Sequence, residues 1–196
     1  MKITAITPDH PLRPAATRLI RAIYALNYGA RVTTFPKTII GLIDKKGKVH
    51  AAAGLRDASE PFFSEHYLES PVETVIGSVT TARVCRETIA EVSSLASRTP
   101  AISVRFMTGL VLYGEELGYD WAFFTATSRL EKLLRRMRLP LITLGTASAS
   151  RVPNPEMWGS YYETAPRVLA FGREQLMPFL RKQEASAPVH EARVHV

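Results

Sequence analysis

The chain has 196 residues, of which 46% are apolar and 22% charged, and these are ordinary values for one globular domain. Its net charge of +7 favours an anionic partner. No helix-turn-helix, zinc-finger or RNA-binding signature accompanies the charge, so nucleic acid is a poor candidate. No apolar run reaches the roughly 18 residues that span a bilayer. Prolines interrupt the start before a signal peptide can form, and we expect a cytoplasmic protein.

The first two patterns along the chain are a helix and a hairpin. Apolar side chains share one face of residues 14–28, and Gly29 follows as a stop signal. Two apolar runs, residues 38–44 and 49–55, flank Lys46-Gly47, a turn signal that predicts an antiparallel hairpin. Arg56 closes its second strand, where its side chain faces either solvent or a cleft.

A less regular segment, residues 59–73, concentrates aromatic and acidic side chains, including Phe62, Phe63 and Tyr67. Two interpretations are open, a hydrophobic plug over the sheet or part of a binding pocket. Residues 75–84 are small and polar, and they predict a loop or a flexible edge.

The single cysteine, Cys85, lies between Arg83 and Arg86. A lone cysteine excludes an internal disulfide. No motif places a histidine beside it to lower its pKa, so the sequence favours an inert thiol over a nucleophile.

Residues 87–127 form the central pattern of the chain. A strand over 87–97, a helix over 101–117 and a second strand over 121–125 predict a βαβ unit with parallel strands. The helix starts with a good cap, Thr99, followed by proline. The free N–H groups of such a helix start favour an anion, typically a phosphate.

Glu91 is the notable residue of this unit, because it interrupts a strand of small and apolar residues. Carboxylates are rarely buried without a partner. Two interpretations remain open: the side chain faces solvent, or it faces a cleft as a base or as the partner of a cation.

The last third begins with a helix over residues 129–137, which predicts either a solvated basic face or a contact with phosphates or a membrane. Strands over 141–144 and 168–171 complete the sheet. We expect one domain over residues 1–181 and a disordered tail over 182–196. The histidines show no metal-ligand spacing, so no metal is expected. The basic residues of the helix are Arg129, Lys132, Arg135, Arg136 and Arg138.

Five phrases in the chain resemble the thermostable hemolysin family. They lie within residues 15–172, and the second and the last are the most specific. The phrases are YALNYGARVTTFP at 24–36, AAAGLRDASEPFFSEHYLESPVE at 51–73, AEVSSLAS at 90–97, GYDWAFFTAT at 118–127 and WGSYYE at 158–163.

The fold that this resemblance implies is an α/β (α+β) GNAT-like acyltransferase fold, similar to that of acyl-homoserine-lactone synthases, with a central mixed sheet flanked by helices. The implied activity is transfer of a fatty acyl group from acyl-CoA or an acyl-carrier protein to a small amine or amino acid. The product would be a signalling or surface-active lipid. Alternatives are a membrane-active hemolysin and a non-catalytic acyl-binding domain.

The resemblance also implies roles for individual residues. Glu91 would be the acid/base group, and Tyr162 would protonate the departing thiolate. The strand before the crossover helix and the helix start would bind the donor. The implied donor-binding residues are Leu95, Ala96, Ser97, Arg98, Ala101 and Ile102, and the implied substrate-binding residues are Arg56, Phe62, Phe63, Tyr67, Arg83, Arg86 and Trp158.

Two departures from the related enzymes bear on the substrates. Ser94 stands where the homoserine-lactone synthases have arginine, which puts that product in doubt. The loop over residues 98–101 lacks the Gly-rich pyrophosphate pattern of ordinary acetyltransferases, so a carrier protein is at least as good a donor as coenzyme A. An acidic carrier would dock on the basic helix through Arg129, Lys132, Arg135 and Arg136, where transient membrane contact is the second interpretation.

Overall fold

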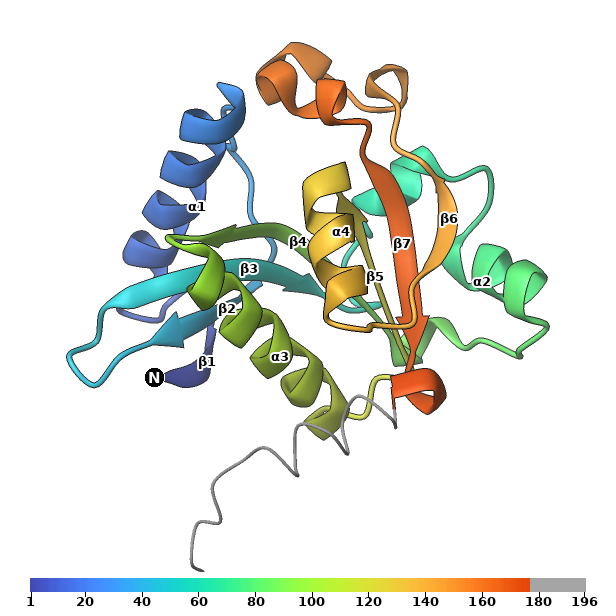
Figure 1. Ribbon diagram of the computed structural model, residues 1–196, viewed down its shortest axis with the longest axis horizontal. Helices are drawn as coiled ribbons and strands as arrows, with labels where there is room; N and C mark the ends of the chain where they lie inside the picture. The colour runs from blue at the N-terminus through green and yellow to red at the C-terminus, as the bar shows by residue number, and fades with distance from the viewer. Residues whose placement is uncertain (177–196) are drawn as a thin grey trace, which may run out of the picture.

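The computed structural model describes residues 1–176. They build a seven-stranded sheet with the order β1-β2-β3-β4-β5-β7-β6 (Figure 1). β4 and β5 are parallel, and the other neighbouring strands are antiparallel. The strands are β1 (Lys2–Ile6), β2 (Thr38–Ile43), β3 (Val49–Arg56), β4 (Ile89–Ser97), β5 (Trp121–Ala126), β6 (Ile142–Thr146) and β7 (Arg167–Gly172).

The helices α1 to α4 and four 3₁₀ segments accompany this sheet in the described range, and residues 173–176 are also helical. None of the helices there is both long and apolar enough to cross a bilayer. The expected tail, residues 182–196, and the last part of the expected domain, residues 177–181, lie outside the described residues. The helices are α1 (Arg13–Tyr28), α2 (Val72–Thr80), α3 (Pro100–Glu116) and α4 (Ser128–Arg136), and the 3₁₀ segments are η1 (Ser64–Tyr67), η2 (Arg86–Thr88), η3 (Ala149–Arg151) and η4 (Pro155–Thr164).

The predicted βαβ unit is confirmed as β4, α3 and β5. Thr99 caps α3, since its hydroxyl accepts a hydrogen bond from the Ile102 N–H, and Pro100 occupies the first turn. The predicted hairpin is confirmed as β2 and β3. In its turn the Asp44 carboxylate accepts the N–H groups of Lys46 and Lys48.

Two elements differ from the sequence-based expectation. β1 was not predicted, because a short edge strand that is only half-buried gives a weak pattern. The loop expected over residues 75–84 is wrong for its first part, which belongs to α2. Val72 and Ile76, four residues apart, are fully buried under this helix. Their burial outweighs the poor helix propensity of the threonine, serine and glycine around them.

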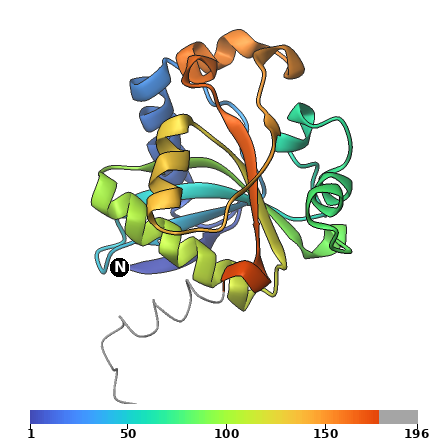
Figure 2. The same cartoon turned by 45° about the vertical axis from the view of Figure 1, so that its right-hand side comes forward.

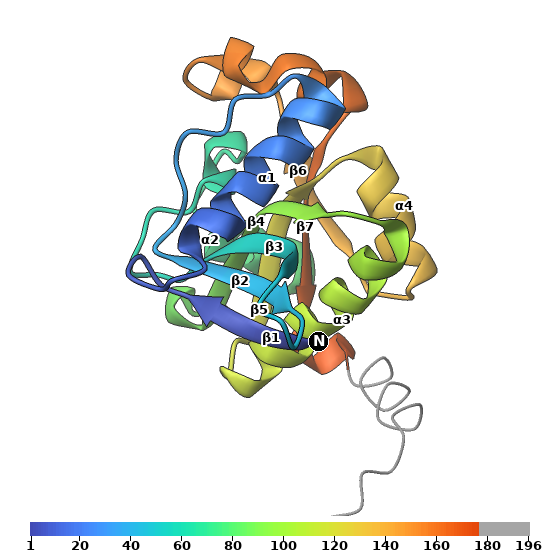
Figure 3. The same cartoon turned by 90° about the vertical axis from the view of Figure 1, so that its left-hand side faces the viewer.

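The helices cover the two faces of the sheet in pairs. α1 and α2 pack on one face, called here the α1 face, together with η1 and η4 (Figure 3). α3 and α4 lie side by side on the other, the α3 face (Figure 2). Alternate residues of β3 show the division, because Ala52 packs toward α1 whereas Ala51 and Ala53 pack toward α3. Each face therefore has its own apolar core.

Candidate active site

β4 contains a bulge at its centre. On β3 only Ala53 separates the paired residues Ala52 and Gly54, whereas Ser94 and Leu95 both lie between their partners on β4. Ser94 is the extra residue, and its φ of 50° is a left-handed value that serine seldom adopts. Such strain is retained where the surrounding structure requires it, often at functional sites.

β4 also separates from β5 at this point. The two parallel strands pair only over the three residues Ile89, Ala90 and Glu91. Beyond them β4 turns toward α1 while β5 continues beneath α4 (Figure 1). Within the described residues, the β5 side of β4 has no strand partner from Val92 onward. Its backbone N–H groups there are free to bind another acceptor.

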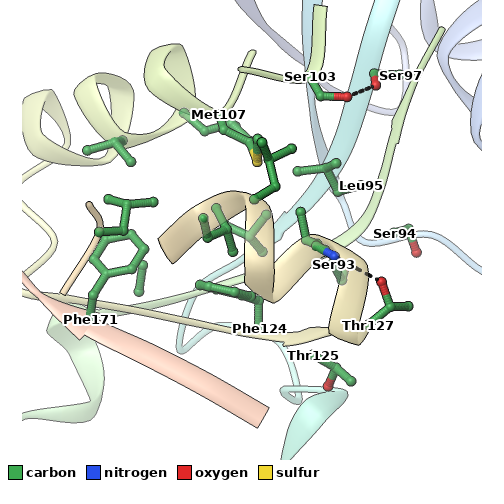
Figure 4. A pocket seen from close by; sticks show the side chains of 18 of the residues that line it. Ser93, Ser94, Leu95, Ser97, Ser103, Met107, Phe124, Thr125, Thr127 and Phe171 are labelled. Atoms are coloured by element: carbon green, nitrogen blue, oxygen red, sulfur yellow. Dashed lines mark hydrogen bonds between the residues drawn. The ribbon is translucent and has the colours of Figure 1, made fainter. Parts of the chain in front are cut away.

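A cavity of about 770 Å³ occupies the opening between the strands. Its lining comes from β4, β5, α3, α4, the C-terminal half of α1 and η4, so it reaches both faces of the sheet. Figure 4 shows the apolar side chains Leu95, Met107, Phe124 and Phe171 around it. The site can enclose a long apolar group beside free backbone donors.

Most of the cationic side chains in the cavity lining come from the loop before α3 and from α4. Arg98, Arg129, Lys132 and Arg136 are all exposed and line it. Arg135 differs from these residues because it forms an i,i+4 ion pair with Glu131, with an N–O distance of 2.8 Å. Part of the predicted basic cluster therefore lies at the cavity and is positioned to bind an anion.

Glu91 is fully buried and lies on the α1 face. Its Oε1 accepts the Ser64 N–H and its Oε2 the Phe63 N–H, both at 2.7 Å, and Arg56 Nη1 lies 3.3 Å from Oε2. The same Nη1 donates to Ser93 Oγ at 3.0 Å. Glu91 is not in the cavity lining, whereas Ser93 is. The carboxylate is thus linked to the cavity through Arg56.

The glycine at residue 54 lets the Ser93 and Pro36 side chains lie close to the backbone of β3. A Cβ atom at residue 54 would lie 2.6 Å from both Ser93 Oγ and the Pro36 side chain. A similar requirement applies to Gly159 in the WGSYYE phrase, where a Cβ would lie 2.0 Å from the Tyr28 carbonyl oxygen. Glycine at 159 lets η4 pack directly against the end of α1.

The predicted aromatic residues form a cluster rather than the cavity wall. Phe63 packs on Trp158 with ring centroids 5.5 Å apart, and the Tyr67 and Tyr162 hydroxyls are hydrogen-bonded at 2.8 Å. Burial raises the pKa of Tyr162 above its ordinary value. Phe62 lies in the core against Phe123. The cavity lining includes none of the predicted residues of this group.

The predicted donor-binding residues divide in a similar way. Leu95, Ser97 and Arg98 line the cavity, and the Ser97 and Ser103 hydroxyls are hydrogen-bonded to each other (Figure 4). Three further predicted residues do not line the cavity. Ala96 packs toward α1, Ala101 is exposed, and Ile102 packs between α3 and the sheet.

Arg83 and Arg86 also lie away from the cavity. Arg83 is exposed and forms no ion pair within residues 1–176. Arg86 binds both oxygens of Glu65, at 2.6 and 2.8 Å, and reaches Glu73 at 2.8 Å. Its guanidinium carbon lies 4.5 Å from the centre of the Phe62 ring. Arg86 therefore fastens η1 to α2 and η2 and has its donors occupied by protein groups.

We expect Arg86→Met to lower the free energy of unfolding by about 2 kcal/mol, since charge-assisted hydrogen bonds are lost and two carboxylates are left without their partner. Burial raises the pKa of Glu65, but the hydrogen bonds from Arg86 and from the Val72 N–H, together with the charge of Arg86, outweigh it, and the net pKa is lowered. This stabilisation is present above the unfolded-state pKa of about 4.3 and is lost as the pH falls through the lower folded-state pKa. Melting temperatures measured from pH 7 to 3 should fall less steeply for Arg86→Met than for the unmodified protein. Parallel curves would contradict this coupling.

Several side chains that line the cavity are absent from the predicted site residues. Ser93 and Thr125 lie on the two separating strands, and Tyr24, Tyr28 and Tyr161 come from α1 and η4. The four-residue spacing of Tyr24 and Tyr28 places both on one side of α1. That spacing was the available signal, but nothing in the sequence shows that α1 ends beside the opening between β4 and β5.

Solved structures of similar fold are acyl-transfer enzymes by name. The AHL synthase LasI has a TM-score of 0.58 and 12% identity, covering 87% of this chain and 88% of its own. MesI, a CoA-dependent acyl-homoserine lactone synthase, has a TM-score of 0.57 and 18% identity, covering 96% and 98%. FeeM, an N-acyl amino acid synthase from uncultured soil microbes, has a TM-score of 0.57 and 16% identity, covering 88% and 98%. At such identities the likeness shows the fold, and it confirms the predicted GNAT-like architecture.

Sequence comparison adds the family. No curated protein matches the chain. The profile of the family described as thermostable hemolysin matches residues 6–177, which is most of the sequence. The chain therefore belongs to the thermostable hemolysin family.

Proposed function

We propose that this protein is an N-acyltransferase that moves a fatty acyl group from a thioester to a small amine. One observation carries the proposal: the bulged β4 separates from β5 around an apolar cavity of about 770 Å³. A thioester laid along β4 would meet free backbone N–H groups at its carbonyl, with its acyl chain among apolar side chains. The folds of the AHL synthases and the N-acyl amino acid synthase agree with acyl transfer.

The reaction needs few protein groups. The amine nitrogen attacks the carbonyl carbon, and negative charge develops on the carbonyl oxygen. Backbone N–H groups near Ser94 and Leu95 would stabilise this charge as an oxyanion hole. The C–S bond then breaks, and the proton that the nitrogen loses passes to the thiolate sulfur.

Glu91 acts in this proposal as a positioning residue. Its carboxylate accepts hydrogen bonds from Arg56 and from two backbone N–H groups and is absent from the cavity lining, whereas a general base must reach the proton that it removes. Through Arg56 it holds the Ser93 hydroxyl, and through Phe63 and Ser64 it holds η1. Tyr162 is likewise poorly placed as the acid, since its hydroxyl is bonded to Tyr67 and is absent from the cavity lining.

We propose an acyl-carrier protein as the donor, because cationic side chains line the cavity beside α4. Arg129, Lys132 and Arg136 extend along α4 beside the cavity and form no ion pair within the described residues. An acidic carrier helix could contact these cations together, which favours rapid and specific encounter. A coenzyme A donor would use the same cations for its phosphates. An assay with both donors distinguishes them.

The test measures thiol release from long-chain acyl-CoA and acyl-carrier protein, with amines and amino acids offered in pools, followed by mass spectrometry. We expect a new N-acyl amine, with acyl-carrier protein as the better donor. Binding of a donor without thiol release would show a non-catalytic acyl-binding domain. Leakage of liposomes by the purified protein, with no release from either donor, would show that it is directly membrane-active.

A further inference from the structure

The cavity has different chemistry on its two sides. Its charged lining residues come from the loop before α3, from α3, from α4 and from the segments around β5 and β7. The residues that α1 and η4 contribute are all uncharged. They are Ile23, Tyr24, Leu26, Asn27, Tyr28 and Tyr161. Within the described residues, the α1 and η4 side of the cavity is therefore neutral, and half of its residues are tyrosines.

Two phenol groups on this side are buried and have no protein partner. Tyr24 is 8% exposed and Tyr161 is 6% exposed. Within residues 1–176, neither hydroxyl forms a hydrogen bond with the protein. Neither phenol oxygen is fully enclosed, because the only fully enclosed side-chain oxygen without a partner in this range is that of Thr4. Both residues line the cavity, so their phenol groups are available to bind a ligand there.

Both phenols keep their protons over the whole working range of pH. Burial raises the pKa of Tyr161 well above its ordinary value, and burial also raises that of Tyr24. The two rings lie nearly parallel, with an interplanar angle of 24° and centroids 6.3 Å apart, and Tyr28 contacts Tyr161 edge-on. The site therefore offers neutral hydrogen-bond donors and aromatic surface.

The side chains between the α1 and η4 side of the cavity and the bulge in β4 carry no net charge. Ser93 and Thr125 line the cavity on the separating strands. The Thr125 hydroxyl donates to Ser64 Oγ at 2.9 Å, and Ser93 accepts from Arg56. The charge of Arg56 is matched by Glu91. Among residues 1–176, no unpaired cation on this path is available for a carboxylate.

We propose that the α1 and η4 side of the cavity is the acceptor subsite, and that it takes an amine with an aromatic or apolar body and no free carboxylate. This inference rests on the proposed acyl transfer and names its acceptor class. The amine would approach the thioester carbonyl from the α1 face. The acyl chain of the donor would lie on the opposite side, between α3 and α4. A free carboxylate on the acceptor would enter a buried site without a cation, which is strongly unfavourable.

The test compares amines that differ only in the carboxylate. Tyramine and phenethylamine are offered against tyrosine and phenylalanine, with the acyl donor held constant. We expect kcat/KM for each amine to exceed that of its amino acid by roughly tenfold or more, a difference of about 1.4 kcal/mol. Equal or better use of the amino acids would overturn the acceptor assignment while leaving acyl transfer established. If Arg98→Ala abolished that use, the carboxylate would be bound by Arg98 instead.

Binding gives the same comparison without turnover. Calorimetry with a thioether analogue of the acyl donor in place should show tighter binding of tyramine than of tyrosine, even if no amine is acylated. Absence of acylation for every amine would count against the proposed function alone. Tyrosine binding as tight as tyramine would count against the subsite alone.

Matched phenol deletions locate the subsite. Tyr24→Phe and Tyr161→Phe should each raise KM for tyramine roughly three- to tenfold, the effect of one lost hydrogen bond, with a smaller change in kcat. Tyr113→Phe removes a phenol from the α3 side of the same cavity and should leave the tyramine-to-tyrosine ratio unchanged. An unchanged KM in both Tyr24→Phe and Tyr161→Phe would place the acceptor elsewhere.

Discussion

Glu91→Ala should lower the free energy of unfolding by about 3–5 kcal/mol, because it leaves the largely buried Arg56 without its ion-pair partner. It also removes the acceptor of two backbone N–H groups, those of Phe63 and Ser64. Denaturant unfolding measures the loss. A variant as stable as the unmodified protein would show that η1 does not depend on this carboxylate.

Glu91→Gln separates positioning from proton transfer. We expect kcat to fall roughly 10- to 100-fold, as for displaced active-site groups, with the shape of the pH profile preserved. If the carboxylate were the general base, the acidic limb of the profile would disappear instead. The double variant Arg56→Gln/Glu91→Gln removes both charges and should recover part of the stability that Glu91→Gln loses. No recovery in the double variant would contradict the ion pair as the source of the effect.

Gly114→Trp should abolish acyl transfer while the fold is retained. Gly114 lies on α3 in the cavity lining, and a Cβ atom there meets nothing within 4 Å. A side chain at residue 114 therefore starts without a clash at its Cβ atom, and a large one would occupy space proposed for the acyl group. We expect thiol release to fall at least about 100-fold, since misplacement of the reacting groups alone has effects of this size.

Gly114→Ala is the matched control. It adds one methyl group and should raise the free energy of unfolding by up to about 1 kcal/mol through helix propensity. Transfer of shorter acyl chains should persist in this variant. Equal activity of Gly114→Trp and the unmodified protein would remove this part of the cavity from the acyl path.

The sequence predicted the parts of the fold that local patterns encode. The cap and first turn of α3, with Thr99 and Pro100, and the turn before β3 follow from short-range preferences. α2 escaped prediction because its helix depends on burying Val72 and Ile76 under distant strands. β1 escaped because an edge strand carries little pattern.

The candidate site was predictable to the extent that it lies on one segment. Leu95, Ser97 and Arg98, which line the cavity, were predicted from the family resemblance, which places donor binding on the strand before the crossover helix and on the helix start. The partners of Glu91 come from β3 and from the start of η1, and no single-sequence pattern joins them to it. Tyr24 and Tyr161 are 137 positions apart in the chain, and they meet only because η4 packs on the end of α1.

The bulge in β4 bends this strand without changing which of its side chains face each apolar core. Glu91 and Ser93 before it, and Ala96 after it, all face α1, whereas Val92 and Leu95 face α3. If Ser94 were omitted, the in-and-out alternation would run unbroken through the same residues. Ser94 is thus an insertion in an otherwise regular strand. A chain one residue shorter could keep both apolar cores and lose only the bend that holds β4 away from β5, so the catalytic geometry is an addition to a scaffold that does not require it.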